Sequence, residues 1–320
     1  MSESALITVE HVYRYYGANC ALHDVSFSVG KGEVLGLLGP NGAGKSTTLQ
    51  ILSGNLAPSA GQVWINGIDL LDQPKAAKLG LGYLPDQPPL YRELTVDEYL
   101  AYCARLHRIA AAQRRAAIDT AKQRCGLTEV GRRLIGNLSK GYQQRVGIAQ
   151  AIVHAPAVVV LDEPTVGLDP LQMREIRALI RELRGEHSII LSTHILPEVQ
   201  AVCDRVQIIS AGKLVLNDSI EGLQRRMRVS SVILGLRRPP PLRELQALPG
   251  VESVETVEPG RFRLHYLPEQ NPAEAVAEQV VANQWGLYEL SPERMSFEQV
   301  FVDITRRDPT EQIVSAEVAS

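Results

Sequence analysis

The sequence predicts an α/β fold over residues 1–220, followed by a smaller α+β domain over residues 221–308. Through the first segment, short apolar runs of strand length alternate with longer helical patterns, which favours a sheet of parallel strands. Two of these runs, residues 157–161 and 188–191, are almost continuously apolar, as expected for strands buried on both faces. Near residue 220 the pattern changes, and three consecutive prolines at 239–241 then interrupt the chain.

The composition is that of an ordinary globular protein. Of 320 residues, 45% are hydrophobic and 22% are charged, which excludes a disordered or fibrous chain. The net charge of −3 argues against a nucleic-acid partner, because phosphate backbones are bound by an excess of Lys and Arg. No apolar run approaches the ~20 residues that cross a bilayer, and no secretory signal is visible at the start. We therefore expect a soluble, cytoplasmic protein with reduced thiols at Cys20, Cys103, Cys125 and Cys203, which show no CxxC spacing.

The elements of the first segment are expected from apolar patterns and turn residues. Residues 63–65 precede an Asn66-Gly67 pair, which is typical of a β-hairpin. Residues 95–125 form one Ala- and Arg-rich helical stretch, and only Gly126 closes it. The remaining expected elements are strands at 7–12, 25–29 and 33–38 and helices at 140–154, 171–183 and 221–228.

The second segment predicts the element order β-α-β-β-α-β, which is that of a ferredoxin-like domain. A Pro259-Gly260 pair marks the turn between its second and third strands. A further helix is expected at 296–305, and residues 309–320 carry no pattern and are expected to be a tail. The expected strands are 231–236, 251–257, 261–267 and 287–290, with helices at 242–248 and 272–283.

The strongest motif fits G-x-x-x-x-G-K-[ST]. It follows the apolar strand 33–38 and opens a helix that runs to about Leu52, which is the context of a phosphate-binding loop, or P-loop. Its backbone N–H groups and the helix N-terminus attract phosphate oxygens. Lys45 supplies a cation for the β- and γ-phosphates, and the Ser46 hydroxyl is a ligand for Mg²⁺. The residues of the motif are Gly39, Pro40, Asn41, Gly42, Ala43, Gly44, Lys45, Ser46 and Thr47.

A second motif places two carboxylates after a buried strand. Asp162 and Glu163 end the apolar run that begins near residue 157, and they are expected at the edge of the sheet where ligands bind in α/β folds. Asp162 is expected to hold Mg²⁺ as a Walker-B aspartate does. Glu163 is expected to polarise the attacking water as a general base, an effect of about 10²–10⁴-fold.

Residues 138–145 read Leu-Ser-Lys-Gly-Tyr-Gln-Gln-Arg and resemble the signature of ATP-binding-cassette (ABC) ATPases, whose usual form is LSGGQ. The P-loop, the signature, the two carboxylates, Gly167-Leu168-Asp169-Pro170 and Ser192-Thr193-His194 stand in the order of that family. The resemblance spans residues 1 to about 220 and implies a helical subdomain over about 90–155. Lys140 and Tyr142 depart from the usual signature, whereas Ser139 and Gly141, which the family uses to contact the γ-phosphate, are kept.

The resemblance also implies how the site works. In ABC ATPases two cassettes pack head to tail, and ATP lies between the P-loop of one and the signature of the other. Ser139 and Gly141 would face the partner's γ-phosphate, and Asp169 would reach across the dimer. His194 would contact the γ-phosphate and hold the attacking water with Glu163. Tyr16 fits the aromatic residue on which adenine stacks.

One motif does not fit cleanly. The family carries a glutamine after an aliphatic-Pro or similar pair, which is Leu84-Pro85 here, but this chain has Asp86 at that position and Gln87 one residue later. Either the loop slips by one residue or Asp86 supplies an oxygen ligand to Mg²⁺. We favour Asp86, because a carboxylate is a good hard-oxygen donor.

The resemblance implies that the chain hydrolyses ATP to drive transport. Its residues 82–100 resemble bacterial exporters of the gliding-motility, drug-resistance and sodium-efflux type, and residues 296–301 resemble the ending of their C-terminal extensions. Such a subunit works as a homodimer with polytopic membrane subunits at the cytoplasmic face of the inner membrane. Two alternatives remain open: an uptake subunit, and a soluble ABC ATPase that acts on ribosomes or nucleic acid. The C-terminal domain is expected to stabilise the dimer or to regulate it.

Overall fold

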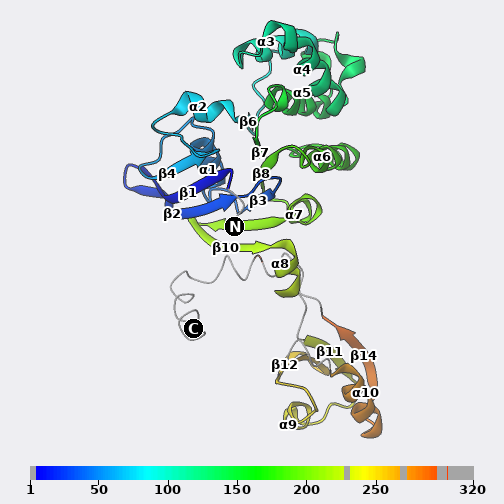
Figure 1. Ribbon diagram of the computed structural model, residues 1–320. Helices are drawn as coiled ribbons and strands as arrows, with labels where there is room; N and C mark the ends of the chain where they lie inside the picture. Colours follow the sequence, from blue (N-terminus) through cyan, green and yellow to red (C-terminus); the bar gives the residue numbers. More distant parts are fainter. Residues whose placement is uncertain (1–4, 227–230, 267–271, 294–300, 302–320) are drawn as a thin grey trace. The chain divides into compact units, whose positions relative to one another are not determined.

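The computed structural model describes residues 5–226, 231–266, 272–293 and 301 (Figure 1). The chain divides into two compact units, residues 1–220 and 221–320, and each is described by itself. Within the described ranges no helix is long and apolar enough to span a bilayer. All four cysteines are free thiols, as predicted.

The first unit contains two sheets, and helices connect several of their strands along the chain. Its strands are β1 (Ile7–Tyr16), β2 (Asn19–Val29), β3 (Val34–Leu38), β4 (Ala60–Ile65), β5 (Ile68–Asp69), β6 (Leu81–Leu84), β7 (Val158–Asp162), β8 (Ser188–Thr193), β9 (Arg205–Ser210) and β10 (Lys213–Ser219). Its helices are α1 (Lys45–Leu52), α2 (Pro74–Leu79), α3 (Val96–Leu106), α4 (Ala111–Arg124), α5 (Lys140–Ile152), α6 (Pro170–Leu183) and α7 (Leu196–Val202), and α8 (Ile220–Arg226) lies at its boundary.

The larger sheet positions the functional site. Its strand order is β10-β9-β3-β8-β7-β6, and every contact between neighbouring strands is parallel except that of β10 with β9. Leu38 pairs with Thr193, and Asp162 pairs with Ser192. The carboxyl ends of β3, β7 and β8 therefore meet at one edge of the sheet, where α/β folds bind ligands.

The early strands lie in a second sheet rather than in the parallel one. β1 pairs antiparallel with both β2 and β4 in the order β2-β1-β4-β5. β1 and β2 follow each other directly through a short turn, which is the connection that antiparallel strands allow. One hydrophobic core joins the two sheets, with Val9 and Val25 on one side and Leu37 and Val160 on the other. The predicted hairpin is confirmed, since Asn66 and Gly67 both have positive φ angles (52° and 74°) between β4 and β5.

The helical subdomain comprises α3, α4 and α5, which lie together beyond the β6 edge of the sheet (Figure 1). The prediction of one uninterrupted helical stretch over 95–125 is wrong at residues 107–110. The N–H of Ile109 donates to the carbonyl of Ala104, and Arg108 has a left-handed φ of 58°. Arg108 thus terminates α3 in the left-handed conformation that a glycine usually adopts after a helix. The sequence has no Gly or Pro at residues 107–110 from which this helix end could be predicted.

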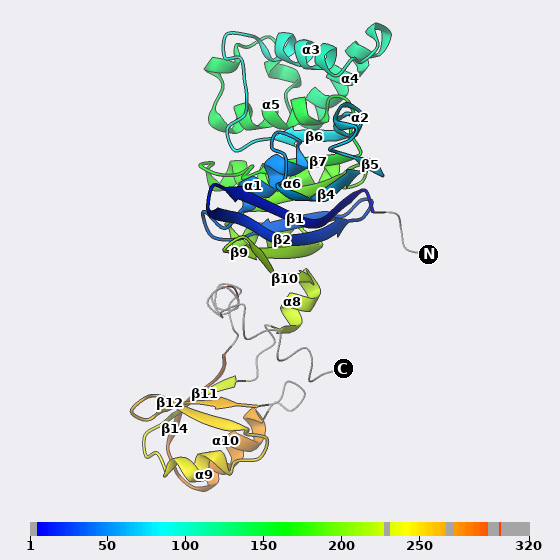
Figure 2. The same cartoon turned by 90° about the vertical axis from the view of Figure 1, so that its left-hand side faces the viewer.

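The second unit has the predicted order β-α-β-β-α-β. Its elements are β11 (Ser231–Leu236), α9 (Leu242–Gln246), β12 (Ser253–Glu258), β13 (Arg261–His265), α10 (Ala273–Ala282) and β14 (Leu287–Pro292). The antiparallel sheet has the order β12-β13-β11-β14, and Figure 2 shows α9 and α10 on one side of it. Leu234, Phe262, Leu264, Val276 and Val280 form the core of this unit. The helix predicted at 296–305 and the tail predicted at 309–320 fall outside the described residues, apart from Phe301.

Candidate active site

The P-loop joins β3 to α1 and depends on glycine at two crowded positions. A Cβ atom at Gly39 would lie 2.3 Å from the carbonyl oxygen of Ile209. Gly44 caps α1 with a φ of 110°, and a Cβ there would lie 2.7 Å from Leu22 Cδ2. Only glycine fits both positions, so the loop keeps its backbone wrapped around the start of α1, where N–H groups attract anions.

Lys45 is buried at the first turn of α1, with 6% of its surface exposed. Its ammonium donates hydrogen bonds to the carbonyl oxygens of Gly39, at 2.7 Å, and Pro40, at 3.3 Å. Its Nζ atom also lies 3.9 Å from Glu163 Oε1. Burial lowers the pKa of Lys45, and the charges of Glu163 and Asp162 oppose that shift. The lysine is therefore a desolvated cation at the pocket wall, where its attraction to phosphate is strongest.

Asp162 ends β7 in a buried position, with 4% of its surface exposed. The hydroxyl of Ser192 donates to its Oδ1 at 2.7 Å. Burial raises the pKa of the Asp162 carboxyl, and the negative charge of Asp86 raises it further, whereas hydrogen bonds from Ser192 and Ser46 act in the opposite direction. The raised pKa of Asp162 therefore arises mainly from burial of its carboxyl group.

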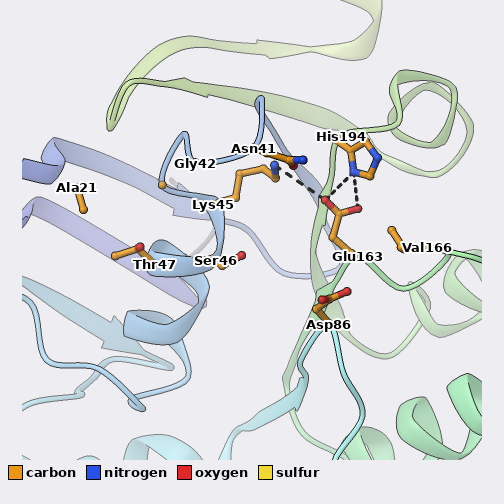
Figure 3. A pocket seen from close by; sticks show the side chains of 11 residues that line it. Ala21, Asn41, Gly42, Lys45, Ser46, Thr47, Asp86, Glu163, Val166 and His194 are labelled. Carbon is orange, nitrogen blue, oxygen red and sulfur yellow. Dashed lines mark hydrogen bonds and ion pairs between the residues drawn. The ribbon is translucent and has the colours of Figure 1, made fainter.

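Glu163 and His194 contact each other across the ends of β7 and β8 (Figure 3). His194 Nδ1 lies 2.9 Å and 3.0 Å from the two carboxylate oxygens of Glu163. A carboxylate only accepts hydrogen bonds, so Nδ1 carries the proton and Nε2 remains for another partner. Glu163 has a left-handed φ of 48°, which is uncommon outside glycine and occurs preferentially at active sites.

Lys45, Glu163 and His194 line one pocket of about 380 Å³, and Asp162 lies outside its lining. The volume is within the range of small-molecule sites. Side chains from the P-loop, from the loop after β6 and from the ends of β7 and β8 point into it (Figure 3). Its lining residues are Ala21, Asn41, Gly42, Gly44, Lys45, Ser46, Thr47, Asp86, Glu163, Val166 and His194.

The residues present fit a magnesium ion. Ser46, Asp162 and Asp86 offer a hydroxyl and two carboxylates, which are the hard oxygen donors that Mg²⁺ prefers. The alternative to Asp86, Gln87, does not line the pocket. No cluster of three or more His, Cys, Asp or Glu in the described ranges forms a metal site alone, so phosphate oxygens and water would complete the coordination, as is usual for Mg²⁺.

Comparison with known proteins decides the family. The family described as ABC transporter matches residues 22–166. The ABC transporter ATP-binding protein NatA of Bacillus subtilis is 39% identical over 210 residues, which cover 65% of this chain and 85% of NatA. The daunorubicin resistance ATP-binding protein DrrA3 of Streptomyces coeruleorubidus is 32% identical over 312 residues, which cover 96% of this chain and 98% of DrrA3. This chain belongs to the ABC transporter ATP-binding proteins.

Solved structures agree with this assignment. The structure of an ATP-binding subunit of an ABC transporter superposes with a TM-score of 0.63 at 32% identity, and the match covers 69% of this chain and 92% of that one. The predicted fold class, the ATPase activity and the use of ATP with Mg²⁺ are confirmed by these relationships. The chain is the ATP-hydrolysing subunit of an ABC transporter.

The predicted ATP contacts outside the P-loop, Ser139, Gly141 and Asp169, do not line the pocket of this cassette. Ser139 caps α5 and accepts a hydrogen bond from the N–H of Tyr142 at 3.4 Å. Gly141 is packed so that a Cβ atom would lie 2.7 Å from Gln172 Cδ. Asp169 caps α6, where its Oδ1 accepts from the N–H of Gln172 at 2.9 Å. The signature and the start of α6 therefore pack against each other outside the lining of the pocket.

Tyr16 also lies outside the pocket lining. It ends β1 with 46% of its surface exposed, and the guanidinium of Arg14 sits 4.7 Å from the ring centroid. One ring face is thus occupied by a cation, which is a favourable contact for an exposed aromatic. Its role as the adenine-stacking residue stays a prediction.

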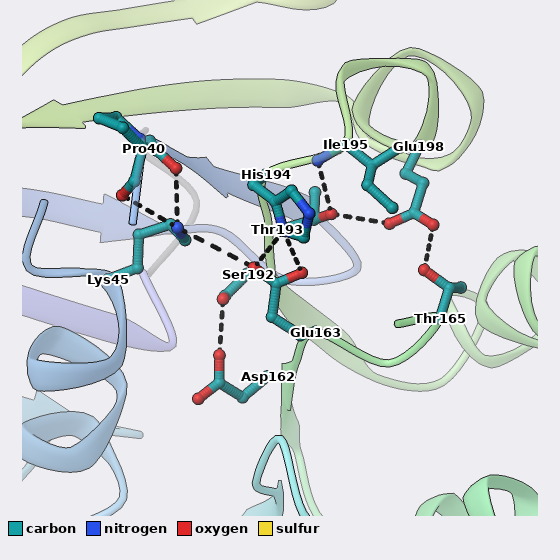
Figure 4. A network of polar contacts seen from close by, with 11 residues as sticks. Pro40, Lys45, Asp162, Glu163, Thr165, Ser192, Thr193, His194, Ile195 and Glu198 are labelled. Carbon is teal, nitrogen blue, oxygen red and sulfur yellow. Dashed lines mark hydrogen bonds and ion pairs between the residues drawn. The ribbon is translucent and has the colours of Figure 1, made fainter. Parts of the chain in front are cut away.

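Sequence reasoning missed a buried carboxylate that binds chain neighbours of the predicted catalytic residues Glu163 and His194. Glu198 on α7 is 1% exposed and accepts hydrogen bonds from the hydroxyls of Thr165 and Thr193 (Figure 4). The sequence could have indicated this residue, because Glu198 lies on the apolar face of α7 with Val199 and Val202. A carboxylate buried there needs a hydrogen-bonding partner.

Proposed function

We propose that this cassette energises export, and that two copies bind two ATP molecules head to tail on paired membrane subunits at the cytoplasmic face of the inner membrane. The observation that carries the proposal is the separation of the two halves of the site. The P-loop, Glu163 and His194 share one pocket, whereas Ser139 and Asp169, which cap α5 and α6, do not line it. A second copy turned head to tail would bring these two residues to the γ-phosphate.

The assignment of export rests on the relatives. DrrA3 is named for daunorubicin resistance, and its match extends over 96% of this chain, including the second unit. Resistance to a toxic compound is a typical outcome of moving it outward, so a relative that matches through both units favours export over uptake. The closer kinship to gliding-motility exporters stays a prediction.

Different residues of the site would bind the phosphates, hold the magnesium ion and activate the attacking water. The backbone of residues 39–44 and Lys45 would hold the phosphates, and the magnesium ion, held by Ser46, Asp162 and Asp86, would neutralise their charge. Glu163 would accept a proton from the attacking water. His194 would keep Glu163 in place through Nδ1 and direct Nε2 at the γ-phosphate.

The second unit has no described catalytic cluster, and we propose that it stabilises the dimer or regulates it. Its open sheet face carries paired charges, including Arg263, which contacts both Glu255 and Glu293. Deletion of residues 221–320 is expected to weaken dimerisation or alter the ATPase rate, as measured by light scattering and phosphate release. Unchanged values for both would remove this role.

The direct test substitutes the proposed base. Glu163→Gln keeps the size of the side chain and one acceptor oxygen for His194 but cannot accept the proton of water. ATP hydrolysis is therefore expected to fall about 10²–10⁴-fold while ATP still binds and holds a dimer. Lys45→Ala is the contrasting variant, because it removes the phosphate cation and should weaken nucleotide binding itself. Normal hydrolysis by Glu163→Gln would refute the assignment.

Binding to a membrane subunit and the direction of transport need a separate experiment. Affinity capture of the Glu163→Gln protein with ATP from detergent-solubilised membranes is expected to recover a polytopic membrane subunit. Reconstitution of that complex in vesicles, with the cassette on the outside, should then accumulate substrate inside them, because export from the cassette side is inward in this geometry. Loss of preloaded substrate from the vesicles would support uptake instead.

A further inference from the structure

Glu198 is a fully buried carboxylate that the proposed mechanism does not use. It lies on the first turn of α7, is 1% exposed and does not line the ATP pocket. We infer that Glu198 is a positioning residue for ATP hydrolysis, which acts on His194 through Thr193 and on the segment after Glu163 through Thr165. The inference deepens the proposed function and rests on the roles of Glu163 and His194 given above.

The first arm of this network surrounds His194. The hydroxyl of Thr193 donates to Glu198 Oε2 at 2.8 Å and accepts from the N–H of Ile195 at 3.0 Å (Figure 4). Two hydrogen bonds to one hydroxyl thus hold the backbone on both sides of His194. Because side chains alternate along a strand, Ser192 turns toward Asp162 while Thr193 turns toward Glu198.

The second arm holds the chain that follows the proposed base. The hydroxyl of Thr165, two residues beyond Glu163, donates to Glu198 Oε1, and the carbonyl of Thr165 accepts from the N–H of Leu168 at 3.2 Å. Thr165 is 2% exposed, so water does not compete for these bonds. One carboxylate therefore ties together the segments that leave β7 and β8.

The chemistry of the group explains why a carboxylate is needed here. Its two oxygens only accept hydrogen bonds, and each faces one hydroxyl donor, so both threonines are oriented by the same rigid plane. Arg177 lies 3.7 Å from Oε1 and compensates part of the charge. A buried charge of this kind contributes little net stability compared with apolar packing, so its benefit lies in the geometry that it imposes on Glu163 and His194.

The test compares Glu198→Gln with the matched control Glu182→Gln, an exposed glutamate on α6. The amide replaces one acceptor oxygen with a donor at constant volume, so one of the two threonine hydroxyls must reverse its hydrogen bond or lose it. We expect kcat for ATP to fall about 10- to 100-fold, the loss that a displacement of about 1 Å causes. The P-loop is untouched, so the dissociation constant for ATP should change less than about threefold, which assigns the loss to the chemical step.

A second pair of variants tests the same arm without altering Glu198. Thr193→Ser keeps the hydroxyl and should retain most of the activity, whereas Thr193→Val has nearly the same shape and should lose activity as Glu198→Gln does. The imidazole ¹⁵N signals of His194, assigned with His194→Gln, provide a direct readout of its Nδ1–H tautomer. These signals should move in Glu198→Gln and Thr193→Val and stay in place in Thr193→Ser.

Three results would overturn the inference. They are a kcat within about twofold of the native value in Glu198→Gln, a parallel loss of kcat and ATP affinity with a lowered melting temperature, and unmoved His194 signals. The outcome is distinguishable from failure of the proposed function. If Glu163→Gln abolishes hydrolysis while Glu198→Gln does not, the base assignment stands and only the positioning role falls.

Discussion

Acidification is expected to destabilise the first unit through one imidazole, His154. Its ring stacks on that of His107, with centroids 3.7 Å apart and planes 6° apart. Its Nε2 lies 3.1 Å from the carbonyl oxygen of Leu81 on β6 and therefore carries the proton of the neutral ring. Its Nδ1 is buried, with no hydrogen-bond partner in the described part of the chain. Protonation would add an unpaired buried donor beside a second imidazole.

The magnitude follows from the resulting pKa. Burial, with a further contribution from His107, lowers the pKa of His154 from 6.5 to about 4. The unfolded chain therefore binds a proton at higher pH than the folded chain does, so stability is complete above pH 6.5 and is lost as the pH falls toward 4. At about 1.4 kcal/mol per pKa unit, His154 accounts for a loss of about 2 kcal/mol at about pH 5 and about 3 kcal/mol at about pH 4.

Urea unfolding measures this loss. The transition of the first unit is identified as the one that Mg-ATP moves to higher urea, and its free energy is then determined without nucleotide at about pH 7.5 and about pH 5. His154→Gln removes the titrating group and leaves an amide donor for Leu81. The decrease in unfolding free energy between the two pH values should be smaller in His154→Gln by about 2 kcal/mol.

His23→Gln is the control, because that histidine is exposed on β2. It should show the same pH dependence as the native chain. Equal losses in the native chain and in His154→Gln would refute the reasoning, since the pH dependence would then arise from other groups.

Three further predictions concern the ATP pocket. Asp162→Asn removes a carboxylate whose pKa is raised by burial and keeps an acceptor for the Ser192 hydroxyl. The melting temperature of the nucleotide-free protein should therefore be equal or higher, while the increase that Mg-ATP causes should be lost. An unchanged increase with Mg-ATP would contradict this. Gly44→Ala places a Cβ atom 2.7 Å from Leu22 Cδ2 at a φ of 110°, and urea unfolding should reveal a loss of at least about 1–2 kcal/mol, with native stability as the contrary result. Asp86→Ala should lower Mg²⁺-dependent phosphate release about 10-fold or more and Gln87→Ala should not; the reverse order would make Gln87 the ligand.

The contiguous motifs were predictable because each forms its own local structure. The P-loop carries its strand, its glycines and its helix within residues 33–52, and the loop lies in the structure as expected. The interruption of the helical stretch at Arg108 was not predictable, because an arginine there adopts the left-handed backbone that glycine usually supplies. The sequence also did not predict that β1 and β2 belong to the antiparallel sheet, because an alternating apolar pattern does not show which sheet a strand joins.

The amino-acid sequence alone predicted the fold class, the family and the residues proposed to face phosphate, because P-loop and carboxylate chemistry require particular residue types at short spacing. Tertiary structure alone decided which side chains support them. The contacts of Thr165 and Thr193 with Glu198, and of His107 with His154, join segments far apart in the chain. Their meeting depends on sheet register and helix packing, and both are set by burial of the whole core rather than by any local pattern.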